Sequence, residues 1–231
     1  MKLNNKRTIL VGLAFLSICA FWQMYDSIVP LILTKTFHMN ETFSGAIMAA
    51  DNILALFLLP FFGSVSDKSH SKLGKRMPFI LFGTGCAIIL MNILPLLDNS
   101  YAAQPSGFKT ASFVIVLGLL LVAMGTYRAP AVALMPDVTP KPLRSRANAI
   151  INLMGAVGGI LYLGVAAVLY PNSKTAGVEH VNYQPLFIVV SAIMFVAIAV
   201  LFLTIKEPKL TAENQALEKE HPEWNLAQDD G

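Results

Sequence analysis

Residues Asp51–Phe79 read DNILALFLLPFFGSVSDKSHSKLGKRMPF, and this stretch decides the fold. It begins with a carboxylate inside an apolar segment and continues through the uninterrupted apolar block Ile53–Phe62. A polar, basic turn follows, and Pro78 opens the next apolar segment. A helix that leaves a lipid bilayer on its cytoplasmic side has this pattern, because lysine and arginine accumulate there. The stretch therefore predicts two membrane-spanning helices joined by a short cytoplasmic turn.

The composition of the chain agrees with a membrane protein. Hydrophobic residues make up 55% of the 231 residues and charged residues only 13%, whereas about 25% is usual in a soluble domain. The net charge of +3 divides into −4 on the polar segment 206–231 and +7 on the rest. The positive charges are scattered through short turns. We therefore expect membrane lipid as a partner and no nucleic acid.

Six apolar segments predict six spanning helices, because each has about the 20 residues needed to cross the hydrocarbon core. They are residues 8–33, 42–62, 77–97, 110–135, 147–170 and 185–205. A signal peptide also has a basic start, but the first segment is longer than such a peptide allows and no Ala-x-Ala closes it, so we expect it to be retained. The predicted fold is an all-α integral membrane bundle. The acidic segment 206–231 follows as a cytoplasmic linker, partly helical before Pro222.

The distribution of lysine and arginine predicts the orientation. With the N-terminus in the cytoplasm, the cytoplasmic segments hold 13 of the 17 basic residues, the outer turns hold three, and Arg128 lies within a span. Because basic residues favour the cytoplasmic side, both termini are predicted to be cytoplasmic and the turns 98–109 and 171–184 to lie outside. We expect a multi-pass protein of the plasma membrane.

Three charged residues lie inside predicted spans: Asp26, Asp51 and Arg128. Such residues are costly in lipid and are functional candidates. At about 1.5 Å per residue they fall within roughly 8 Å of one another in depth. Two carboxylates and one arginine leave one negative charge, which favours uptake of a proton or a cation. With their polar neighbours Gln23 and Asn52 they are candidates for cation or substrate binding. The alternative is a structural ion pair beside one neutral carboxyl group.

Prolines and glycines add to this pattern. Pro30 and Pro130 each free a backbone carbonyl one turn earlier, which membrane helices tolerate where the carbonyl lines a cavity or finds a polar partner. Ordinary helix kinks are the alternative. The spacing of Gly155 and Gly159 permits close helix packing.

Several function classes are disfavoured. The four histidines lie outside the predicted spans, which argues against haem, di-iron or serine–histidine chemistry within the bundle: His38, His70, His180 and His221. There is no phosphate-binding GxxxxGK[ST] loop for ATP-driven transport. Cys19 and Cys86 both lie in apolar segments and make no CxxC pair. We expect no enzyme activity, no catalytic residue and no metal or cofactor beyond a coupling ion.

A family resemblance rests on four segments. Gly63–Asp67 (GSVSD) followed by Gly74–Phe79 (GKRMPF) resembles the loop between the second and third helices of the major facilitator superfamily. The spacer is longer than in the commonest form. The longer form ending in Pro-Phe is similar to the sucrose-transporter and glycoside–pentoside–hexuronide:cation symporter branch. Residues 136–137 (PD) and 144–148 (RSRAN) agree with that branch.

The resemblance implies a twelve-helix transporter made of two six-helix bundles, each a 3+3 inverted repeat. It implies transport of a small solute, a sugar or glycoside, with H⁺ or Na⁺ by alternating access. The chain corresponds to the first bundle, so its implied partner is a second six-helix half. Asp26 and Asp51 stand at places comparable to the sugar- and cation-binding carboxylates of melibiose-type members. His38 is comparable to a loop histidine of plant sucrose carriers, whereas Arg128 does not match the register of their fourth-helix arginine.

In the family, residues of the loop clamp helix ends at a cytoplasmic gate. The corresponding candidates are Gly63, Asp67, Gly74, Lys75, Arg76, Asp137 and Arg144. We expect Asp67 to pair with one of the basic residues Lys75, Arg76 or Arg144. A six-helix scaffold or regulator without transport of its own, or an inactive fragment of a transporter, is the competing interpretation.

Overall fold

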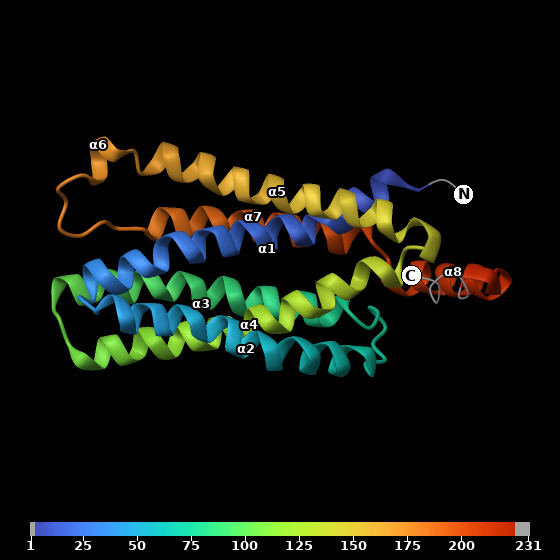
Figure 1. Ribbon diagram of the computed structural model, residues 1–231, viewed down its shortest axis with the longest axis horizontal. Coiled ribbons are helices and arrows are strands. Elements are labelled where there is room, and N and C mark those ends of the chain that lie inside the picture. The colour runs from blue at the N-terminus through green and yellow to red at the C-terminus, as the bar shows by residue number, and fades with distance from the viewer. Residues whose placement is uncertain (1–2, 225–231) are drawn as a thin grey trace.

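The computed structural model describes residues 3–224, in which every regular element is a helix. Six of these helical segments are long and apolar enough to cross a membrane. Figure 1 shows them side by side in one bundle. The elements are α1 (Asn5–Leu31) with the π-helical turn η1 (Ile32–Thr36), α2 (Glu41–Asp67), α3 (Met77–Ala103), α4 (Gly107–Asp137), the 3₁₀ turn η2 (Lys141–Leu143), α5 (Arg144–Leu169), the short α6 (Asn172–Thr175), α7 (Gln184–Thr204) and α8 (Glu207–Glu220).

The packing of the spans follows an internal symmetry. The main contacts join α1 with α5, α2 with α4, α3 with α4, α1 with α7, and α3 with α7. Exchanging the first three spans with the last three maps the α1–α5 pair onto α4–α2 and the α3–α4 pair onto α7–α1. This is the pattern of a 3+3 inverted repeat, and it agrees with the all-α half-fold predicted from the sequence.

The helices begin where local chemistry satisfies their free N–H groups. The side chain of Asn4 accepts a hydrogen bond from the N–H of Arg7, and Asn40 accepts from the first residues of α2. Proline occupies the first turn of α3 and α7, as Pro78 and Pro185, where it has no hydrogen bond to lose. These features mark the starts of α1, α2, α3 and α7.

Close packing between α1 and its neighbours holds the bundle together. A Cβ atom at Gly158 of α5 would lie 2.0 Å from the carbonyl oxygen of Leu16, so only glycine allows this approach of α5 to α1. On the other side, the fully buried Tyr127 of α4 donates to the carbonyl oxygen of Ala14 at 2.9 Å and contacts the hydroxyl of Ser17. Since buried hydroxyls are costly without partners, this bond fixes α4 against α1.

Large apolar side chains cover the outside of the bundle. In the most apolar part of α2 no residue is buried within the bundle, and the exposed side chains there include Ile53, Leu56, Phe57 and Phe61. Such a surface suits lipid or another membrane-embedded protein surface.

Several helix ends differ from those predicted from hydropathy. The predicted turn 98–109 is wrong at both ends, because α4 begins at Gly107 and α3 continues to Ala103. There Asp98 is buried and Tyr101 packs on Phe37 at 4.4 Å between ring centroids. Likewise α2 continues through the glycine and serines that follow Phe62. High hydropathy marks the part of a helix that suits the hydrocarbon core. Backbone hydrogen bonding, and with it the helix, continues past that part.

At the end of the bundle that carries α8 lie the start of α1, the 68–76 turn and the 138–143 connection (Figure 1). We call this the α8 end. The turns 37–40, 104–106 and 170–183 lie at the opposite end.

Candidate functional site

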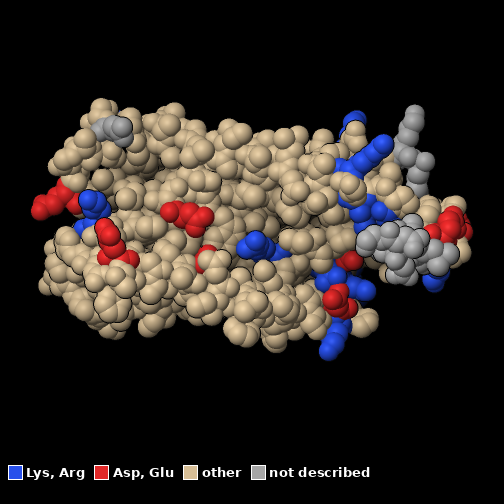
Figure 2. All heavy atoms as spheres, in the orientation of Figure 1, with Lys and Arg blue, Asp and Glu red and all other residues tan. Residues whose placement is uncertain are grey.

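The first candidate site lies midway along the bundle, where α1, α2 and α4 meet. Asp51, Arg128 and Trp22 line one small hollow of about 20 Å³. The guanidinium carbon of Arg128 lies 5.6 Å from the centre of the Trp22 ring, which is within cation–π range. Figure 2 shows charged side chains of both signs midway along this face, where most of the surface belongs to uncharged residues.

The carboxylate of Asp51 is held by its own neighbour. Its Oδ1 accepts from the backbone N–H and the side-chain amide of Asn52, at 2.5 and 2.8 Å. Within residues 3–224, Arg128 makes no ion pair with Asp51 or Asp26. Asp26 is exposed on α1 and close enough to Asp51 for the two charges to interact.

The structure therefore brings together some of the predicted residues and separates another. Asp51, Asn52 and Arg128 gather where α2 faces α4, and Asp26 lies nearby on α1. Gln23 instead faces α5, with its Oε1 3.8 Å from where a Cβ on Gly159 would be. Among the described residues, no group of three or more histidine, cysteine, aspartate or glutamate side chains is arranged to hold a metal ion.

The second candidate site lies at the α8 end and centres on Arg76, whose side chain is only 7% exposed. Its Nε donates to Asp137 at 2.8 Å, and one Nη donates to Asp67. The other Nη donates to the hydroxyl of Ser66 at 2.6 Å and to the carbonyl of Gly63 at 3.4 Å. One arginine thus joins the end of α2, the start of α3 and the end of α4.

The electrostatics of this network favour the charged arginine. Burial opposes the charge on Arg76, but the hydrogen bonds and charges of Asp137 and Asp67 outweigh it, so the pKa of the guanidinium is raised. Of the three basic candidates, Arg76 is therefore the one that pairs with Asp67.

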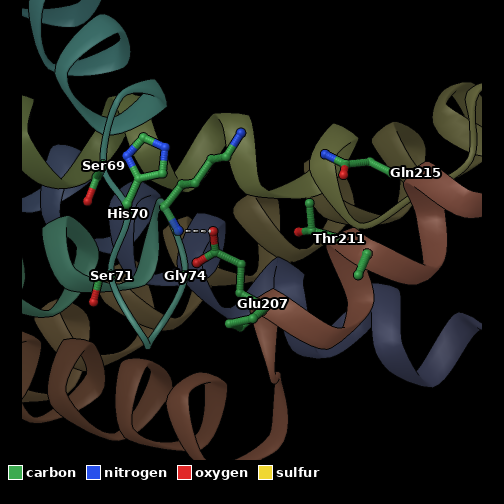
Figure 3. Close-up of a pocket in the computed structure, with 10 residues that line it drawn as sticks. Ser69, His70, Ser71, Gly74, Glu207, Thr211 and Gln215 are labelled. Carbon is green, nitrogen blue, oxygen red and sulfur yellow. Dashed lines mark hydrogen bonds between the residues drawn. The ribbon is translucent and has the colours of Figure 1, made fainter.

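A residue that the sequence did not indicate completes the network. Glu207, in the first turn of α8, is 2% exposed. Its carboxylate accepts the backbone N–H groups of Lys75 at 2.7 Å, Arg76 at 2.9 and 3.1 Å, and Met77 at 2.8 Å. Figure 3 shows this carboxylate directed at the backbone that follows Gly74. Glu207 therefore acts as the N-terminal cap of α3, from outside α3.

Gly74 is required by this cap. Its φ of +111° is a conformation that side chains disfavour, and a Cβ there would lie 2.4 Å from the Glu207 carboxyl carbon. Lys75, beside it, contributes its backbone N–H rather than its side chain to the cap. The turn therefore needs glycine both for its backbone conformation and for the approach of α8.

Further along, α8 binds the connection between α4 and α5. Asn214 donates to the carbonyl oxygens of Asp137 and Thr139 at 3.2 and 3.4 Å. Arg144 pairs with Glu218 at 2.9 Å and donates to the carbonyl of Thr139 at 3.1 Å. Arg144 thus anchors α8. It does not contact Asp67, although it is one of the three partners that the sequence offers for Asp67.

Beside this docked helix lies a cavity of about 350 Å³ between the 68–76 turn and α8. Its walls include Ser69, His70, Thr211 and Gln215, which Figure 3 labels.

Several known proteins are similar to this chain in sequence. The sequence model of the Major Facilitator Superfamily matches residues 11–226. The chain is 35% identical over 158 residues to the sucrose transport protein SUC3 of Arabidopsis thaliana, covering 63% of this chain and 26% of that protein. It is 36% identical over 154 residues to the sucrose transport protein SUT3 of Oryza sativa subsp. indica, covering 61% and 30%. It is 25% identical over 186 residues to solute carrier family 45 member 3 of Homo sapiens, covering 79% and 34%. The chain thus spans about a third or less of the length of these relatives.

Proposed function

Because the chain belongs to the Major Facilitator Superfamily, we propose that it forms one six-helix half of a secondary transporter. The substrate class is a sugar or glycoside, since the plant relatives are named sucrose transport proteins. The driving force is a gradient of H⁺ or Na⁺, and the solute moves by alternating access between two six-helix halves.

One observation carries this proposal: charged and polar side chains lie at mid-depth on a face that the bundle itself does not cover. Asp26 and Asn52 are exposed, and Asp51 and Arg128 are half-buried. A charged side chain at the centre of a bilayer costs about 2.5–3.5 kcal/mol on insertion scales. Such a face is stable when it borders a water-filled cavity or another protein surface. A second six-helix half supplies both.

The residues of this face have distinct proposed roles. Asp51 is the carboxylate that binds the coupling ion, because it lines one hollow with Arg128 yet makes no ion pair with it among the described residues. Asp26 and Asn52 contribute polar groups to the proposed water-filled cavity between the two halves. Arg128, held on the Trp22 ring, supplies the positive charge that tunes Asp51.

The α8 end is proposed to be the cytoplasmic gate. Arg76 fastens three helix ends through two carboxylates, so separating them breaks charge-assisted hydrogen bonds. These bonds hold the cytoplasmic ends of the helices together in one state of the cycle and loosen in the other.

Orientation has a direct test, with the plasma membrane as the proposed location. A cysteine replacing Ser106, in the turn between α3 and α4, should react with a membrane-impermeant maleimide added to intact cells. A cysteine replacing Ser71, in the turn between α2 and α3, should react only after the cells are opened. The reverse pattern would contradict the proposed orientation.

Transport is tested in proteoliposomes that contain this chain together with a second six-helix half. Radiolabelled sucrose is the probe, with an inward H⁺ or Na⁺ gradient. We expect accumulation that an ionophore collapses. Asp51→Asn should abolish accumulation and retain exchange, because the amide keeps hydrogen bonding but cannot take up a proton or neutralise a cation.

A double variant separates the ion-site role from a structural ion pair. If Asp51 only balances Arg128, replacing both residues by neutral ones restores activity, and the ion site moves to Asp26. If the assembled protein binds its second half but moves no sugar under either gradient, the scaffold interpretation is favoured.

A further inference from the structure

At the end of the bundle opposite α8, one histidine links three separate segments. His180 lies in the segment 170–183, which connects α5 with α7. Its Nε2 lies 2.9 Å from Oδ1 of Asn99 on α3, and its Nδ1 lies 3.3 Å from the hydroxyl of Thr36 at the end of η1. Asn99 also donates to Asn182 of the same segment at 2.9 Å. The imidazole therefore ties the segment to two separate helices.

A buried carboxylate lies next to this histidine. Asp98 is 0% exposed, and neither of its oxygens accepts a hydrogen bond from the described residues. Its Oδ2 lies 3.9 Å from Nε2 of His180. The hydroxyl of Thr36 interacts with Asp98 and also lies 3.3 Å from Nδ1 of His180, so it can donate to only one of them at a time. An anion buried with so few donors is strongly disfavoured, so Asp98 needs either a proton or a cationic imidazole beside it.

Protons can reach this pair from two cavities of about 420 and 260 Å³. Both cavities are lined by His180 and Thr36, so the histidine stands between them. The His180 side chain is 27% exposed. The titratable groups around it come from η1 and the turn after it, from α3 and from its own segment. They are Lys35, His38, Asp98, Tyr101, Glu179 and Tyr183.

We propose that Asp98 and His180 together form a proton-binding site that fastens the segment 170–183 to α3 and η1. With one proton on the pair, an imidazolium faces the buried carboxylate. Nε2–H then donates to Asn99 and Nδ1–H donates to the hydroxyl oxygen of Thr36, which leaves the Thr36 O–H free to donate to Asp98. Loss of that proton leaves a neutral imidazole above a buried anion. The segment then loosens, which admits water to Asp98. The fastened form binds the proton more tightly, so it is favoured at low pH and lost as the pH rises.

This inference goes beyond the proposed transport function and does not depend on it. The test is hydrogen–deuterium exchange of the purified chain in lipid nanodiscs between pH 5 and 8.5. The measured quantity is the protection factor of the backbone amides of Val178 and Gln184, whose N–H groups donate to the carbonyl of Thr175 and to the side chain of Asn182, both within the segment 170–183. A protection factor removes the intrinsic pH dependence of exchange. We expect protection to fall as the pH rises, by about tenfold for each pKa unit that separates the fastened and released forms.

Two variants should remove the pH dependence. His180→Gln keeps hydrogen-bonding groups but does not titrate near neutral pH. Asp98→Asn removes the buried charge. His38→Asn is the matched control, because His38 lines the same 260 Å³ cavity and has a φ of 51° that asparagine tolerates. This control should keep the wild-type pH dependence.

Protection that is flat across this pH range in the wild-type chain overturns the proposal. So does a wild-type pH profile in the His180→Gln variant, and so does loss of the profile in the His38→Asn control alone. The His180→Gln variant decides the question by itself if Asp98→Asn does not fold.

Discussion

Removing the Glu207 carboxylate should destabilise the α8 end more than any surface change on the same helix. The carboxylate accepts three backbone N–H groups at the start of α3, at 2.7 to 3.1 Å, and it is almost fully buried. Each buried donor left without a partner costs about 1–3 kcal/mol. The adjacent cavity of about 350 Å³ lets water replace part of what is lost, which lowers the total below the roughly 3–9 kcal/mol of three donors left without any partner.

We therefore expect Glu207→Ala to lower the free energy of unfolding by about 2–4 kcal/mol. Glu207→Gln keeps one acceptor oxygen and loses the charge, so about 1–2 kcal/mol is expected. At about 2–4 °C per kcal/mol for a chain of this size, the alanine variant should melt roughly 4–16 °C below wild type. Thermal unfolding in detergent is the assay, read with a dye that fluoresces on reaction with the cysteines as they become exposed.

The matched control is Glu213→Gln. Glu213 lies on the same helix with its side chain 51% exposed, 3.8 Å from Lys209, so its removal should cost less than about 0.5 kcal/mol. Hydrogen exchange adds a local reading, because the amides of residues 75–77 should lose protection in Glu207→Ala. Equal melting temperatures for Glu207→Ala and Glu213→Gln would refute the capping role.

A double variant adds a specific coupling. Gly74→Ala places a Cβ 2.4 Å from the Glu207 carboxyl carbon and strains a backbone with φ of +111°. In the Glu207→Ala background only the backbone strain remains, about 1–3 kcal/mol. The two changes together should therefore cost less than the sum of the single changes.

Two further predictions concern the other contacts that hold the bundle. Asp137→Asn should destabilise the chain by about 1–3 kcal/mol and Asp67→Asn by less than about 1 kcal/mol. Both carboxylates accept from one buried arginine, but the Asp137 side chain is 28% exposed and the Asp67 side chain 60%. Equal effects in chemical unfolding would contradict this order. Gly158→Ala should cost about 1–3 kcal/mol or more, since its Cβ would meet a backbone oxygen at 2.0 Å, whereas Gly164→Ala, with nothing within 4 Å, should be neutral or stabilising in the same melt.

The spans and the fold class could be predicted from the sequence because lipid imposes a simple rule. Each span needs about 20 apolar residues, and the basic turns between them are conspicuous. The symmetry of the bundle followed from the family resemblance rather than from hydropathy. The helix ends could not be predicted as well, because a helix such as α3 continues through polar residues once they pack inward, as Asp98 does.

The α8 end was predicted only in part. The loop motif indicated Asp67 and Arg76, but three candidate partners for Asp67 remained open, since sequence spacing does not say which side chain points inward. The capping role of Glu207 could not be predicted, because Glu207 lies in an acidic, polar segment that resembles a solvated linker. A glutamate followed by Pro208 at a helix start was the available hint, yet capping of a different helix depends on where α8 docks.

The contrast between Arg76 and Arg128 bears on how the mid-depth charges should be interpreted. An arginine that holds helix ends together in this protein has a recognisable environment: Arg76 is nearly buried and binds two carboxylates with good geometry. Arg128 is half-buried, rests on an aromatic ring, and pairs with neither nearby carboxylate within the described residues. An ion pair whose only task was to hold helices would gain stability by closing as Arg76 does, because an unpaired charge at this depth is costly. The open arrangement of Asp51 and Arg128 therefore favours groups kept available for a ligand or a coupling ion over a purely structural pair.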